Sequence, residues 1–295
     1  MNRQNILRVQ FGNRGFGQSD SPAARRGCGG ARLLIGLAMA AFALISYFGS
    51  SVYNPVTGEK QHVSLSEEQE VALGLQSAPE MAQQYGGLHP DEQLQATVDA
   101  IGRKLVENTA AAQTRYPFDF HLLADPQTVN AFALPGGQVF ITYALYSRLE
   151  SEGQLAGVLG HEVGHVVGRH SAEHIAKQQL TQGLTGAVVL STYDPNDPSS
   201  QRTAQIAMVI GQLVNMKFGR EDELESDKLG VRFMSEAGYD PRALIGVMRI
   251  LEEASGGGRP PEFFSTHPNS DTRVAEIEEA IQRQFPGGVP EGLRP

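Results

Sequence analysis

HEVGH at residues 161–165 is the most informative stretch of the chain. It lies within a helical pattern that predicts one helix from residue 154 to about residue 179. Residues four apart on a helix differ by about 40° around its axis, so the two imidazoles point the same way and can hold one cation. Glu162 stands beside that position, where a carboxylate can accept a proton from bound water. The stretch therefore predicts a metal site on a helix, with its own general base.

The metal that we expect is zinc, one ion per subunit. Zinc accepts imidazole nitrogen and lowers the pKa of bound water towards about 7. Cys28 is the only cysteine, which excludes a cysteine-rich site. Catalytic zinc takes three protein ligands, of which His161 and His165 supply two. A third histidine six residues further on is one solution, but that position is Ser171, so a more distant carboxylate must complete the set.

A cluster of acidic residues on a later predicted helix supplies candidates for the third ligand. Spacing alone does not choose among them, and a solvated acidic face is the simpler interpretation. Helical geometry favours Glu223 and Asp227, which share one face with glycines beside them at 219 and 230. Glycines also flank the two histidines, so the helices can approach closely enough for one carboxylate to reach the metal. Asp227 can then hydrogen-bond a ligand imidazole. The full cluster is Glu221, Asp222, Glu223, Glu225 and Asp227.

Four segments together resemble a known family of zinc peptidases. They are HEVGHVVGRH at 161–170, REDELESDKLG at 220–230, NAFALPGGQVFIT at 130–142 and THPNSDTR at 266–273. The chain is similar, over about residues 64–285, to the gluzincin metallopeptidases that include HtpX, the CAAX prenyl proteases and the BepA and LoiP types. The family's third ligand is the first Glu of an E-x-E-A-D pattern. This implies Glu223 here, although Ser226 replaces the usual alanine.

The resemblance implies two further roles. His267 and Arg273 match a pair near the family's metal, where either side chain can stabilise the oxyanion and His267 can occupy the open metal position in a resting state. A capping or core role for His267 is the alternative. The segment Asn130, Ala131, Phe132 and Ala133 resembles an edge strand to which a substrate peptide adds as a further strand. An ordinary hairpin is the alternative there.

The beginning of the chain predicts a membrane anchor. Residues 1–32 contain six arginines and one acid, so this basic segment carries +5 and the rest of the chain −14. Residues 33–48 are uncharged, and 33–50 form a transmembrane or signal-anchor segment. Arginines stay on the cytoplasmic side, which predicts a single-pass protein of the bacterial inner membrane with its catalytic domain in the periplasm. Secretion after signal cleavage, a mitochondrial inner membrane and a buried core helix are the alternatives.

The rest of the chain predicts a helix-dominated α+β domain with a small antiparallel sheet. We expect a linker at 51–63, the metallopeptidase domain at 64–285 and a tail at 286–295. Helices are predicted from a capping box at Ser66 to about residue 84 and over 90–107, and strands near 118–122, 129–134 and 138–142. Loops are expected at 193–200 and 255–261. His170 and His174 turn away from the metal on the predicted helix and are interpreted as structural or exposed.

These observations predict a membrane-anchored zinc endopeptidase. By resemblance it hydrolyses misfolded or misassembled envelope proteins, and the sequence has no nucleotide-binding loop, so we expect no requirement for ATP. The acidic body makes nucleic acid an improbable partner. Prenyl-protein processing is disfavoured because it accompanies several membrane spans in that relative. The remaining alternative is a chaperone-like or adaptor protein with latent protease activity.

Overall fold

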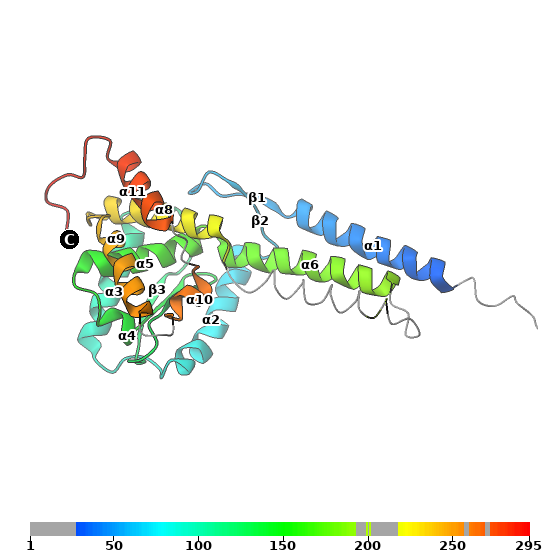
Figure 1. Ribbon diagram of the computed structural model, residues 1–295, viewed down its shortest axis with the longest axis horizontal. Helices are drawn as coiled ribbons and strands as arrows, with labels where there is room; N and C mark the ends of the chain where they lie inside the picture. The colour runs from blue at the N-terminus through cyan, green and yellow to red at the C-terminus, as the bar shows by residue number, and fades with distance from the viewer. Residues whose placement is uncertain (1–27, 193–198, 200, 202–217, 257–259, 269–271) are drawn as a thin grey trace, which may run out of the picture.

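The fold is seen in a computed structural model, which describes residues 28–192, 199, 201, 218–256, 260–268 and 272–295 (Figure 1). The basic segment up to residue 27, most of the predicted 193–200 loop and the middle of the 255–261 loop lie outside the described residues. The described helices are α1 (Cys28–Gly49), α2 (Glu67–Gln84), α3 (Glu92–Glu107), α4 (Tyr143–Tyr146), α5 (Glu152–Val167), α6 (His170–Thr192), α8 (Arg220–Glu236), α9 (Ala243–Ser255), α10 (Phe263–Thr266) and α11 (Arg273–Gln284). The strands are β1 (Ser51–Tyr53), β2 (Lys60–His62), β3 (Asp119–Leu123), β4 (Ala131–Leu134) and β5 (Gln138–Thr142).

Helices dominate the domain, as predicted, and several begin where the sequence indicates. Ser66 caps α2 with the expected capping box, in which its side chain accepts from the backbone of Gln69 and the Gln69 side chain accepts from the backbone of Ser66. Asp91 caps α3 and Ser151 caps α5 in a similar way. Local side-chain chemistry therefore fixes the start of the helix that carries HEVGH.

The sheet is mixed, which corrects the expected antiparallel sheet. Its strand order is β3-β5-β4. β4 and β5 form the predicted antiparallel hairpin around Gly136 and Gly137, both of which have positive φ. β3 pairs parallel with β5 because the chain crosses to the far edge, forms β4 and returns through the centre. Alternating apolar residues identify strands, but they do not encode this order.

α5 is the centre of the core. It packs on α8, α9 and α3 and lies against the sheet through β4 and β5. The contact with α8 is close because both helices present glycine, as the sequence predicts. A Cβ on Gly230 would lie 3.3 Å from the backbone nitrogen of His161. This contact brings the acidic helix within side-chain reach of HEVGH.

The predicted single helix over residues 154–179 is wrong. α5 ends at Val167, Arg169 adopts a left-handed conformation with φ of 55°, and α6 starts in a new direction at His170. Tertiary contacts hold this break. The guanidinium of Arg169 is buried and donates to the Glu70 carboxylate and the backbone oxygen of Leu65. The helical periodicity of the sequence does not reveal such contacts. The break changes where His170 lies.

The expected linker and the expected tail both form ordered contacts. Part of the expected 51–63 linker forms the β1–β2 hairpin, in which Ser51 pairs with His62. In the expected tail, Pro295 accepts a hydrogen bond of 2.8 Å from Gly153 at the start of α5. Among the described residues, α1 is the one helix long and apolar enough to cross a membrane, over Gly30–Gly49. It extends away from the domain alongside α6 (Figure 1).

Candidate metal centre

Four buried side chains from three parts of the chain converge on one point. His161 and His165 come from α5, Glu223 from α8, and His267 from the residue after α10. One ligand atom from each lies within 4.8 Å of the others. The structure thus brings together the three predicted metal ligands and His267, and of the five acidic residues considered only Glu223 contributes an atom to this group.

The spacing of these atoms suits a small tetrahedral ion. Nε2 of His161 lies 3.1 Å from Nε2 of His165, and Nε2 of His165 lies 3.4 Å from Oε1 of Glu223. Nδ1 of His267 lies 3.3 Å from Nε2 of His161 and 3.0 Å from Oε1 of Glu223. A tetrahedron with metal–nitrogen bonds of 2.0–2.1 Å has edges of about 3.3 Å. The residues therefore fit a metal, with His267 as a fourth donor.

Asp227 and Arg273 surround this group. Nδ1 of His161 donates to Oδ1 of Asp227 at 2.9 Å, which leaves Nε2 of His161 unprotonated and free to bind a metal. Arg273 donates to both oxygens of Asp227 at 2.8 and 2.7 Å, and its NH1 lies 3.0 Å from Oε2 of Glu223. One arginine therefore holds the carboxylates at positions 223 and 227.

Comparison with known proteins agrees with this geometry. The family description "Peptidase family M48" matches residues 92–281, which is more than half of the chain. The chain belongs to peptidase family M48. The resemblance noted in the sequence is confirmed at this level, and all the candidate site residues lie inside the matched range.

Several M48 relatives are similar over most of this chain. The "Beta-barrel assembly-enhancing protease" of Escherichia coli K12 is 29% identical over 202 residues, which cover 66% of this chain and 40% of that protein. The protein of the same name from Yersinia pestis is 29% identical over 238 residues, covering 79% and 48%. "Mitochondrial metalloendopeptidase OMA1" of Schizosaccharomyces pombe is 30% identical over 241 residues, covering 80% and 68%. The chain thus spans less than half the length of these two bacterial relatives.

Within the M48 site, burial sets the protonation of the central groups. Burial raises the pKa of Glu162, which suits a carboxylate that must take up a proton. Burial also lowers the pKa of His165 well below its usual range, which favours the neutral, metal-binding imidazole. Burial opposes ionisation of Glu223, but the neighbouring imidazoles of His165 and His267 outweigh it and lower the pKa of Glu223. His165 is thus suited to donate a lone pair and Glu223 to supply negative charge.

Glu162 is placed beside the converging atoms without being one of them. Its Oε1 lies 3.6 Å from Nε2 of His267. The two carboxylate oxygens of Glu162 and Nε2 of His267 are buried. None of these three atoms has a hydrogen-bond partner among the described residues. Buried polar atoms are normally paired, so these three are available to a ligand or a water molecule.

His170 and Glu225 belong to the site, which the sequence interpretation missed. Nε2 of His170 donates to Oε2 of Glu225 at 2.8 Å, so Nδ1 of His170 accepts from Nδ1 of His165, also at 2.8 Å. This leaves Nε2 of His165 unprotonated, as Asp227 does for the other ligand histidine. Because α6 starts in a new direction, His170 does not turn away as expected. Gly168, three residues after His165, was the signal for that break.

His174 also has a structural partner, at the edge of the site. Its Nε2 lies 3.2 Å from Oδ2 of Asp222, near the start of α8. The expectation that it does not bind the metal agrees with its absence from the converging group.

The predicted substrate strand is an edge strand of the sheet. β4 contains Ala131, Phe132 and Ala133, and Asn130 precedes it. Thr142 of β5 donates to the backbone oxygen of Asn130, so Asn130 faces β5. Backbone groups alternate in direction along an antiparallel strand, and those of Ala131 and Ala133 therefore face away from β5. Ala131 is fully buried, whereas Ala133 is half-buried. Oδ1 of Asn130 is buried and has no hydrogen-bond partner among the described residues.

Proposed function

We propose that this M48 protein is a zinc-dependent metalloendopeptidase. The observation that carries the proposal is the convergence of His161, His165 and Glu223 on one point, with Glu162 beside it. These three side chains hold the zinc. When bound, zinc supplies a Lewis acid that polarises the scissile carbonyl and makes a water molecule more acidic. The histidine and carboxylate donor set is one that zinc accepts.

Glu162 carries the proton in this mechanism. Its unpartnered, buried carboxylate takes a proton from the attacking water and passes it to the nitrogen of the leaving amine. The raised pKa supports both steps, because the group must accept the proton and later release it. Arg273 orients the carboxylates of Asp227 and Glu223 and does not stabilise the oxyanion, because all three of its guanidinium nitrogens face these two carboxylates.

Metal removal tests the proposal. We expect the purified protein to contain one zinc per chain and to cleave an unfolded protein such as reduced casein. Chelation is expected to abolish cleavage, and stoichiometric zinc to restore it. Metal analysis and gel-based proteolysis measure both quantities. A metal-free protein that cleaves casein at an unchanged rate contradicts the proposal.

His267 occupies the fourth position around the proposed metal, which a substrate carbonyl would need. Its Nδ1 lies among the metal-ligand atoms, and its ring stacks on Phe263 at 4.4 Å between centroids. The imidazole must therefore move before a substrate binds. We propose that the displaced imidazole then donates to the oxyanion.

His267→Ala is therefore expected to bind a hydroxamate inhibitor about tenfold more tightly than the wild type, because no side chain competes for the position. Inhibitor titration of the zinc-loaded proteins measures the difference, and His174→Ala, outside the converging group, is the matched control. Equal affinity of His267→Ala and wild type would exclude His267 from the ligand set.

The free edge of β4 suits an extended peptide. We propose that substrate adds antiparallel or parallel to the segment Asn130, Ala131, Phe132 and Ala133, so that main-chain hydrogen bonds accept many sequences. The hairpin with β5 and the outward-facing backbone groups of half-buried Ala133 support this binding mode.

Ala133→Pro removes one outward N–H donor while leaving the side that faces β5 unchanged. The loss of one such hydrogen bond is expected to lower kcat/KM about 2–10-fold, mainly through KM. Ala133→Val, which keeps the donor, is the control. Steady-state kinetics with a fluorogenic peptide decides the matter: equal kcat/KM for the proline and valine variants contradicts strand addition at this position.

We also propose that the substrates are misfolded or misassembled envelope proteins and that hydrolysis does not require ATP. The names of the bacterial relatives support the first statement, and the lack of a nucleotide-binding loop in the sequence supports the second. We place the protein in a bacterial inner membrane as a single-pass protein, anchored by α1 with the catalytic domain in the periplasm. The apolar α1 and the arginines before it support this orientation.

A further inference from the structure

α1 and α6 lie side by side and run in opposite directions. α1 approaches the domain and α6 leaves it (Figure 1). Small residues bring them close at two levels. A Cβ on Gly183 would lie 2.7 Å from the Cβ of Ala43, and a Cβ on Gly36 would lie 2.8 Å from the backbone oxygen of Ala187. The two helices therefore share one contact face over several turns.

The outer faces of this helix pair are apolar and exposed. Ile45 of α1 is 72% exposed and Phe42 is 74% exposed, while Val188 and Leu190 of α6 are 40% and 36% exposed. α1 belongs to the membrane under the proposed anchoring, and its exposed side chains suit lipid. A helix that packs along a membrane-spanning helix must enter the same bilayer.

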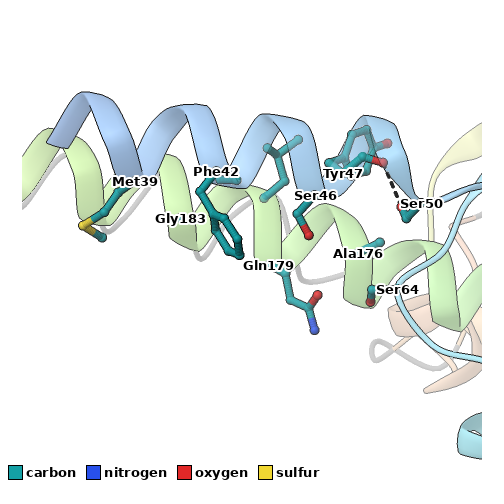
Figure 2. Close-up of a pocket in the computed structure, with 11 residues that line it drawn as sticks. Met39, Phe42, Ser46, Tyr47, Ser50, Ser64, Ala176, Gln179 and Gly183 are labelled. Atoms are coloured by element: carbon teal, nitrogen blue, oxygen red, sulfur yellow. Dashed lines mark hydrogen bonds between the residues drawn. The ribbon is translucent and has the colours of Figure 1, made fainter. Parts of the chain in front are cut away.

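The composition of α6 changes at the level where α1 leaves the predicted bilayer. Its first two turns contain Glu173, His174 and Lys177, whereas residues 178–192 contain no charged residue or histidine. Figure 2 shows this level, where a cavity of about 230 Å³ is lined by Tyr47 of α1, by Ser50 just after it, and by Ala176 and Gln179 of α6, among others. The last charge on α6 thus lies beside the last turn of α1.

Aromatic residues mark the same level. The Tyr47 ring at the end of α1 stacks on His62 of β2 with 4.7 Å between centroids. Phe48, the next residue, and Tyr53 of β1 are both exposed. Tyrosine is enriched where a membrane meets water, so these side chains indicate the boundary.

Two hydroxyls in the far half of α6 donate within the helix, whereas Gln178, Gln179 and Gln182 at its start are exposed. Thr181 donates to the backbone oxygen of Lys177 at 2.8 Å, and Ser191 donates to that of Ala187 at 2.8 Å. Hydroxyls that bond one turn back in this way lose little on entering lipid.

We propose that residues 178–192 of α6 lie in the bilayer beside α1, so that the catalytic domain itself enters the membrane. The inference rests on the proposed anchoring by α1. Lipid is the occupant of the outer faces of both helices. It follows that α1 is not cleaved off as a signal peptide, because its removal would expose the glycine-lined face of α6 to lipid. The sequence alone does not identify α6 as a membrane helix, because its mean hydropathy over the length of a membrane span is too low.

The position of α6 also indicates which substrates the site reaches. α6 starts three residues after α5, and its eight residues from His170 to Lys177 span about 12 Å along the helix. The metal centre is therefore held close to the membrane surface. Segments of membrane-bound proteins just outside the bilayer are the substrate class that this placement favours.

Lipid quenching of a fluorophore tests the proposal on the full chain. Cys28→Ser removes the only cysteine, and single cysteines then replace Ile45 in α1, Val188 or Leu190 in α6, and exposed Glu107 at the end of α3 as the water-facing control. Each purified variant carries bimane and is reconstituted into phosphatidylethanolamine and phosphatidylglycerol vesicles, and variants whose zinc content equals the wild type are compared.

We expect nitroxide-labelled lipid to cause a strong loss of fluorescence at positions 45, 188 and 190, and iodide in the water to cause one only at position 107. If lipid quenches position 45 while iodide quenches positions 188 and 190, α6 lies in water and this inference fails although the anchoring stands. If iodide also quenches position 45, the anchoring fails and the inference with it. If neither reagent quenches positions 188 and 190, protein covers them, which likewise overturns contact with lipid.

Discussion

Glu162→Gln is expected to lower the rate of peptide hydrolysis by about 10²–10⁴-fold while the protein keeps its zinc. The glutamine amide has nearly the same shape as the carboxylate but cannot accept the proton of the attacking water. The proposed ligand side chains of His161, His165 and Glu223 are unchanged, and Glu162 makes no hydrogen bond that the substitution would break. Peptide cleavage and metal analysis on the same preparation measure the two quantities.

Glu152→Gln is the matched control, because this glutamate lies in the first turn of the same helix and is exposed. It is expected to cleave at the wild-type rate. Equal cleavage by wild type and Glu162→Gln would refute the role of Glu162. A wild-type protein that prevents aggregation of an unfolded substrate as well as Glu162→Gln does, with no cleavage by either, would instead favour the chaperone-like alternative.

The sequence predicted those parts of the site that depend on local geometry. Two histidines four residues apart must share a helix face, and the structure places both at the converging point. The choice of Glu223 over its acidic neighbours needed the resemblance, because spacing along α8 fits more than one of them. Glu225, two residues away, instead accepts from His170.

The parts that the sequence did not predict depend on contacts between distant residues. The break between α5 and α6 is held by Arg169 and Glu70, which are 99 positions apart. The parallel pairing of β3 with β5 depends on the path of the chain around the sheet. The proposed membrane position of α6 follows only from its comparison with α1, which packs beside it. In each case the deciding contact lies outside any local window of sequence.

Arg273→Met is expected to have the largest effect on folding stability, about 3–5 kcal/mol in the metal-free protein. The arginine side chain is 1% exposed and lies between the carboxylates of Asp227 and Glu223. Burial opposes ionisation of Asp227, but the charge of Arg273 outweighs it and lowers the pKa of this carboxyl. Methionine fills a similar volume without charge, so two buried carboxylates would lose their shared cation.

Urea unfolding in detergent, followed by circular dichroism, measures this effect. Arg283→Met on the same helix is the matched control, since its ion pair with Glu279 is exposed and its loss should cause no measurable change. Zinc is expected to reduce the Arg273→Met deficit because it binds the folded state through Glu223 and offsets that charge. Asp227→Asn added to Arg273→Met should restore part of the stability by removing the second charge. If Arg273→Met unfolds at the same urea concentration as Arg283→Met, the two carboxylates do not depend on Arg273, and the paired charges around the centre are not what holds α8 against α11.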